Sequence, residues 1–115
     1  MRPAAQSLQL FKQKFVVNVK TSGSYKVLNV IDEELIGKKL NEGGLSVYLD
    51  PNYFSGKAVD EDELKELIKE NNIINIVGNR SISFVLSLGY GAKEAIRIID
   101  GVGFLIIYKF TDNYK

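Results

Sequence analysis

Apolar and polar residues alternate along the first part of the chain in the way that β-strands require. Phe15, Val17 and Val19 share one side of residues 15–20, and a second apolar run covers residues 25–31. Turn-forming residues at 21–24 separate the two runs, which therefore predict a β-hairpin. A short helical turn is expected at residues 32–37 and a polar loop at residues 38–44. Further strands are expected at residues 45–50, 73–77, 95–99 and 104–110.

Two helices are predicted between these strands. Asp60 is followed three residues later by Glu63, which completes a capping box at the start of the first helix. Asn79 is the expected cap of the second helix, and Gly89 its expected end. The strand, helix and strand within residues 73–99 are long enough for a right-handed parallel crossover.

The order of these elements predicts a single compact α+β domain over residues 13–115. We expect a mixed β-sheet of about six strands with two main helices. Residues 1–12 are expected to form a flexible basic N-terminal arm. No apolar run has the length of a membrane span and no leader opens the chain, so a cytoplasmic protein is expected.

Composition removes several kinds of chemistry. The chain has no cysteine and no histidine, which excludes disulfides, thiol chemistry and ordinary zinc sites. It also lacks the side chain most often used as a general acid or base near neutral pH. No cofactor is expected, no catalytic residue is assigned, and an enzyme becomes the less favoured class. The scarcity of sulfur residues fits a thermophilic source, whereas the asparagine content argues the other way.

Charge is unevenly distributed although the net charge is only +1. Residues 1–26 contain five basic and no acidic residues, whereas residues 27–70 contain eleven acidic and five basic ones. A basic entry segment beside an acidic middle can steer an anionic partner. The alternative is a hairpin whose lysines are simply solvated.

The strongest candidate anion site is the stretch in which an apolar strand meets Gly78 and a helix start. The backbone N–H groups at a helix N-terminus, here those of Asn79, Arg80 and Ser81, can bind a phosphate. Neither nucleotide-binding glycine loop is present, however. The alternative is therefore a structural turn followed by a cap.

Further candidate contacts for RNA or another polyanion are basic residues of the opening segment and of the expected loop, namely Lys12, Lys14, Lys38 and Lys39. Tyr48, Tyr53 and Phe54 could stack on bases, although aromatic residues near loops more often cover the core. Asn75 lies in an apolar strand, so its amide either pairs inside the protein or points to a ligand.

Ordered blocks of this sequence resemble one archaeal family. They run from Asp32-Glu33-Glu34-Leu35-Ile36-Gly37-Lys38-Lys39 through Glu42-Gly43, Tyr53-Phe54-Ser55-Gly56 and Val59-Asp60-Glu61. Ile74-Asn75-Ile76-Val77-Gly78 with Ser81, and Ile96-Arg97-Ile98 with Gly101-Val102, extend the match. Over roughly residues 28–103 the chain thus resembles the archaeal domain of unknown function 424 family.

The resemblance implies a small cytoplasmic protein associated with translation, and hence contact with RNA or a ribosomal particle. It supplies no catalytic residues. Ile31 stands where the family pattern has a cysteine, and Gly103-Phe104 stands where it has proline and histidine.

Together, the charge and the resemblance favour a non-catalytic RNA- or ribosome-associated binding protein. One alternative is a metal-dependent enzyme that acts on a phosphate-containing substrate through Asp32, Glu33 or Glu34. Another is a protein-interaction module that uses an exposed face of the final strand.

Overall fold

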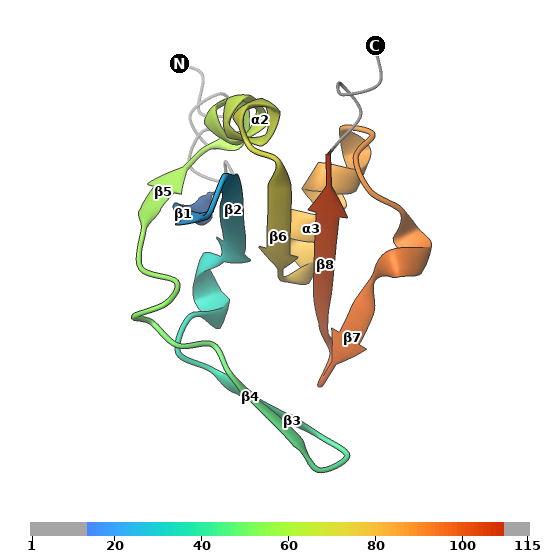
Figure 1. The fold of residues 1–115 in the computed structure, drawn as a ribbon. Helices are drawn as coiled ribbons and strands as arrows, with labels where there is room; N and C mark the ends of the chain where they lie inside the picture. Colours follow the sequence, from blue (N-terminus) through green and yellow to red (C-terminus); the bar gives the residue numbers. More distant parts are fainter. Residues whose placement is uncertain (1–13, 110–115) are drawn as a thin grey trace, which may run out of the picture.

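The computed structural model describes residues 14–109, which fold around a six-stranded sheet with the order β5-β1-β2-β6-β8-β7 (Figure 1). The strands of this sheet are β1 (Phe15–Ser22), β2 (Tyr25–Asp32), β5 (Lys57–Val59), β6 (Ile73–Val77), β7 (Arg97–Ile99) and β8 (Val102–Tyr108). The α+β class and the mixed six-stranded sheet predicted from the sequence are confirmed. The expected N-terminal arm, residues 1–12, lies outside the described residues.

The strands at the two ends of the expected crossover within residues 73–99, β6 and β7, are parallel but are not neighbours in the sheet. β2 and β6 are parallel neighbours, whereas β8 is antiparallel to both β6 and β7. β6 and β7 therefore run in the same direction, but β8 lies between them. The reason is the tight turn after β7, where Asp100 and Gly101 have φ angles of 52° and 78°. Such a turn folds β8 directly back onto β7.

Both main helices pack on one face of the sheet. Helix α2 (Glu61–Glu70) begins as predicted, since the Asp60 carboxylate accepts a hydrogen bond of 2.9 Å from the Glu63 backbone N–H. Helix α3 (Asn79–Ser87) lies behind β6 and β8 in Figure 1. The core on this face includes Leu64 and Ile68 of α2, Ile82 and Val85 of α3, and the strand residues Phe15, Val17, Leu28, Val30, Ile74, Ile76, Leu105 and Ile107.

The opposite face carries a second, smaller core and a projecting hairpin. Strands β3 (Lys39–Glu42) and β4 (Leu45–Tyr48) pair only with each other among the described residues. Gly43 and Gly44 connect them with φ angles of 55° and 83°, as a two-residue hairpin turn requires. Leu40 and Val47 of the hairpin contact a cluster that contains Ile31, Leu49, Phe54 and Val77.

Two sequence-based expectations about this region were wrong. Residues 38–44 are not simply a polar loop, because residues 39–42 form β3, and β4 belongs to this hairpin and not to the main sheet. The glycine pair was interpreted as loop when it is the turn of a hairpin. The short edge strand β5 and two 3-10 turns, η1 (Glu33–Leu35) and η2 (Lys93–Ala95), complete the described structure. Within residues 14–109 no helix is long and apolar enough to cross a membrane.

Candidate functional site

The predicted anion site at the start of α3 contains a carboxylate of the protein itself. Asp32 ends β2, and its Oδ2 accepts a hydrogen bond of 3.1 Å from the Arg80 backbone N–H. Its Oδ1 accepts one from the Ser81 backbone N–H, at 2.8 Å, and one from the Ser81 hydroxyl. Asp32 is 4% exposed and Ser81 is fully buried. The parallel pairing of β2 with β6 brings Asp32 to the end of β6, from which α3 starts.

Gly78 makes this close approach possible. Its φ angle is +118°, and a Cβ atom at this position would lie 2.3 Å from Asp32 Cγ. A residue with a side chain would thus be strained by the backbone and would also collide with the carboxylate. The glycine that the sequence suggested for a phosphate turn therefore gives room to Asp32.

Asn79 does not cap α3, contrary to the expectation from the sequence. The cap position is Gly78, and the Asn79 side chain turns toward the β7–β8 turn. Its Nδ2 donates to the Gly101 carbonyl at 3.0 Å, and its Oδ1 accepts from the Gly103 N–H at 2.8 Å. The capping role falls to Asp32, which is 49 residues away from Ser81 in the sequence. A local pattern could not reveal that distant partner.

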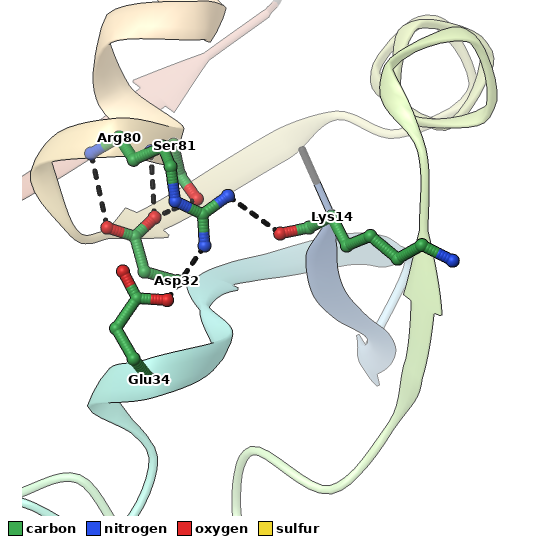
Figure 2. A network of polar contacts seen from close by, with 5 residues as sticks. All are labelled: Lys14, Asp32, Glu34, Arg80 and Ser81. Carbon is green, nitrogen blue, oxygen red and sulfur yellow. Dashed lines mark hydrogen bonds and ion pairs between the residues drawn. The ribbon is translucent and has the colours of Figure 1, made fainter. Parts of the chain in front are cut away.

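Arg80 extends the network to the surface (Figure 2). One guanidinium nitrogen donates to the Lys14 backbone carbonyl and another forms an ion pair of 2.8 Å with Glu34. The hydrogen bond from Arg80 holds the pKa of the Glu34 carboxyl below its ordinary value, and the charge of Lys38 acts in the same direction. The Lys14 ammonium group points away from this network in Figure 2.

The arrangement around Asp32 has a direct chemical consequence. The N–H groups of Arg80 and Ser81 already donate to Asp32, so an incoming phosphate would have to displace that buried carboxylate. The Arg80 guanidinium is likewise paired with Glu34. We interpret Asp32, Arg80 and Ser81 as the joint that holds α3 on the sheet.

The acidic cluster is also used structurally. Both oxygens of Asp32 accept hydrogen bonds from α3, and Glu34 faces Arg80. In the part of the chain that the structure describes, no three acidic residues converge on a point where a metal ion could bind.

Lys38 and Lys39 lie at the base of the projecting hairpin. Both are exposed, and Lys39 is directly opposite Tyr48 in the pairing of β3 with β4. Residues that are directly opposite in an antiparallel pair share one face. Asn41 and Ser46, the next pair but one, are exposed on that same face. Of the lysine pair, Lys39 therefore shares a surface with Tyr48, whereas Lys38, whose backbone carbonyl accepts from the N–H of the buried Leu49, lies at an alternate position of the hairpin base. Lys12 lies outside the described residues.

Asn75 belongs to a chain of side-chain amides that crosses three strands. Its Nδ2 donates to Asn29 Oδ1 at 2.8 Å, and Asn29 Nδ2 donates to Asn18 Oδ1 at 3.0 Å. Asn18 Nδ2 in turn donates to the carbonyls of Tyr53 and Ser55. Of the two alternatives for Asn75, the structure shows pairing inside the protein, and the partner, Asn29, lies on the neighbouring strand. Asn18 and Asn29 were missed because their shared register depends on the strand order.

Comparisons with known proteins agree with this architecture. The family model described as "Protein of unknown function (DUF424)" matches residues 19–110. A crystal structure of an uncharacterized conserved protein from Methanopyrus kandleri is similar with a TM-score of 0.70 and 24% sequence identity, over 84% of this chain and 94% of that one. At this identity the likeness shows a shared fold. No curated protein matches the chain.

Proposed function

We propose that this chain, which belongs to the DUF424 family, is a non-catalytic protein that binds RNA, alone or within a ribosomal particle, through the outer face of the β3–β4 hairpin. The observation that carries this proposal is the cross-strand pair of Lys39 and Tyr48. This pair places a cation that can bind a phosphate beside an aromatic ring that can stack on a base, both on one exposed surface.

The hairpin has the shape that such a contact needs. It extends away from the sheet in Figure 1, and its inner residues Leu40 and Val47 anchor it to the second core. Tyr48 remains 52% exposed. A two-stranded ribbon fixed at its base can present one face to a nucleic acid while the other stays packed.

The hairpin is also fixed near its tip. Asp100 Oδ2 accepts a hydrogen bond of 2.9 Å from the Asn41 backbone N–H, and Glu42 accepts one from the Asp100 backbone N–H. These two bonds tie β3 to the β7–β8 turn. The outer face is therefore held in place before RNA arrives, which lowers the entropic penalty of binding.

The side chains of this face can bind RNA in two ways, through charge and through stacking. Lys39 supplies the sequence-independent attraction to phosphates, which weakens as salt rises, and the exposed Lys38 adds a second charge at the base of the hairpin. Tyr48 supplies a stacking surface, which salt affects little. Asn41 and Ser46, nearer the tip of the hairpin, add polar groups to the same face. Such a surface favours single-stranded RNA, whose bases are free to stack on side chains.

The test is a titration of a fluorescent single-stranded RNA oligonucleotide at several salt concentrations. In the double variant Lys38→Gln, Lys39→Gln the slope of log affinity against log salt should fall by roughly 1.4, about 0.7 for each lost phosphate contact. Tyr48→Ala should weaken binding about tenfold and leave that slope unchanged. The absence of binding at about 50 mM salt would overturn the proposal.

A matched control exists on the helix face. The double variant Lys65→Gln, Lys69→Gln removes the same charge from α2, on the opposite side of the sheet. It should keep the salt slope of the wild-type protein. Equal effects of both pairs would mean that net charge, and not the hairpin, attracts the RNA. Co-sedimentation with purified ribosomal subunits then shows whether the partner is free RNA or a ribosomal particle.

A further inference from the structure

Strand β7 forms one edge of the main sheet, and β3 reaches this edge at its end, where Glu42 accepts a hydrogen bond from the Asp100 N–H. β7 is the outermost strand in the order β5-β1-β2-β6-β8-β7, and among residues 14–109 its hydrogen-bonded neighbour is β8 alone. Ile98, at its centre, is 55% exposed. An edge strand of this kind can accept another strand through its backbone.

The backbone groups of Ile98 point away from β8. The two-residue turn at Asp100 and Gly101 makes Ile99 and Val102 a hydrogen-bonded pair, so the next pair, Ile98 and Gly103, is not hydrogen-bonded. The contacts of Gly103 agree with this assignment. Its N–H donates to Asn79 Oδ1 and its carbonyl accepts from the Gly78 N–H, both away from β7. The N–H and carbonyl of Ile98 therefore face the open edge.

A cavity lies beside this edge, between β7 and α3. Its volume is about 240 Å³, and Ile82, Leu86, Ile96 and Ile98 supply its apolar walls. The volume suits an aliphatic side chain.

The charge at the cavity is positive. Lys93, on η2, is the charged residue of its lining. A carboxylate near Lys93 would gain a favourable interaction. Free backbone groups and a pocket for a side chain are the elements with which a sheet edge binds an extended peptide, and the charge of Lys93 adds a preference for an acidic one.

We propose that the β7 edge binds an extended, acidic peptide segment of a protein partner as an additional strand. The peptide backbone pairs with Ile98, one aliphatic side chain enters the cavity beside α3, and a carboxylate lies near Lys93. This surface is separate from the outer face of the β3–β4 hairpin and does not depend on RNA binding.

The test uses a fluorescein-labelled pool of heptapeptides in which aliphatic residues and threonine alternate and glutamate ends the chain, followed by fluorescence polarisation. Ile98→Pro removes the outward N–H and leaves the β7–β8 hydrogen bonds intact, so the fold should persist. Binding should weaken at least about tenfold, because the N–H is lost and the proline ring obstructs the edge. Lys93→Gln should weaken binding about threefold.

Two controls keep the result specific. Ile98→Ala retains the backbone N–H and should bind better than Ile98→Pro. A peptide pool N-methylated at its central residue should bind about tenfold more weakly than the parent pool, because it cannot donate to the Ile98 carbonyl. An unchanged far-ultraviolet circular dichroism spectrum and unfolding temperature of Ile98→Pro would show that the variant is folded.

Three results would overturn the proposal. One is the absence of a polarisation change at saturating protein, and another is equal binding by Ile98→Pro and the wild-type protein. The third is a dimer in sedimentation velocity that Ile98→Pro abolishes, since the edge would then hold a second copy of this chain.

Discussion

The Asp32 carboxylate accepts hydrogen bonds from both the backbone N–H and the hydroxyl of Ser81, across 49 residues of sequence. It ties the end of β2 to the first turn of α3. The Asp32 side chain thereby caps α3 as the Asp60 side chain caps α2. Asp60 directly precedes its helix, whereas Asp32 lies on a strand distant in sequence from α3. A buried group with three donors around it is expected to matter more than an exposed local cap.

Asp32→Ala should lower the free energy of unfolding by about 3 kcal/mol, since it removes the cap and leaves buried donors without a partner. Urea denaturation followed by circular dichroism measures this change. The matched control is Asp60→Ala, which removes one capping bond and should have an effect of about 1 kcal/mol. Equal effects of the two substitutions would contradict the role assigned to Asp32.

Gly78→Ala should destabilise the protein by about 3 kcal/mol or more, because strain at a positive φ angle adds to a collision with Asp32. Thermal unfolding is the appropriate measurement. Gly89→Ala is the control, since Gly89 also has a positive φ angle, +94°, but its Cβ atom would meet nothing within 4 Å. That variant should lose only about 1 kcal/mol, which isolates the contribution of the collision.

Asn29→Ala should cost about 2 kcal/mol of stability, because Asn29 is 1% exposed and is the central member of the amide chain. Its loss leaves Asn75 without an acceptor and Asn18 without a donor. The double variant with Asn75→Ala should be less destabilised than the sum of the single variants, by roughly 1 kcal/mol. Asn52→Ala in an exposed turn serves as the control, with an effect within about 0.5 kcal/mol.

The ion pair of Glu34 with Arg80 should make stability depend weakly on pH. Because the pKa of Glu34 is held below its ordinary value in the folded protein, the pair stabilises the fold above that ordinary value. The contribution is lost as the pH falls through the lowered pKa. Its size should stay under about 1 kcal/mol, since the Glu34 side chain is 61% exposed.

Glu34→Gln reports on this contribution. The difference in unfolding free energy between the wild-type protein and the variant should be largest near neutral pH and should vanish in acid. The neighbouring Glu33→Gln, also on the exposed turn η1, is the control and should show no such difference. A Glu34→Gln difference that grows as the pH falls would contradict the direction of the shift.

The sequence by itself determined the elements that depend on neighbouring residues. The period-two pattern of Phe15, Val17 and Val19 predicts β1, and the spacing of Asp60 and Glu63 predicts the start of α2. Each of these features is formed by residues within a few positions of one another, so a short window contains its full physical cause.

Only the tertiary structure decided which distant groups meet. The cap of α3 is Asp32 and not Asn79, because the pairing of β2 with β6 brings that carboxylate to the helix start. The amide chain of Asn75 likewise depends on the order of three strands. The position of β8 between β6 and β7 depends on the tight turn that follows β7. The Lys39–Tyr48 face exists because β3 and β4 pair with each other and leave the main sheet. Such partners are selected by the free energy of the whole fold, which no local pattern contains.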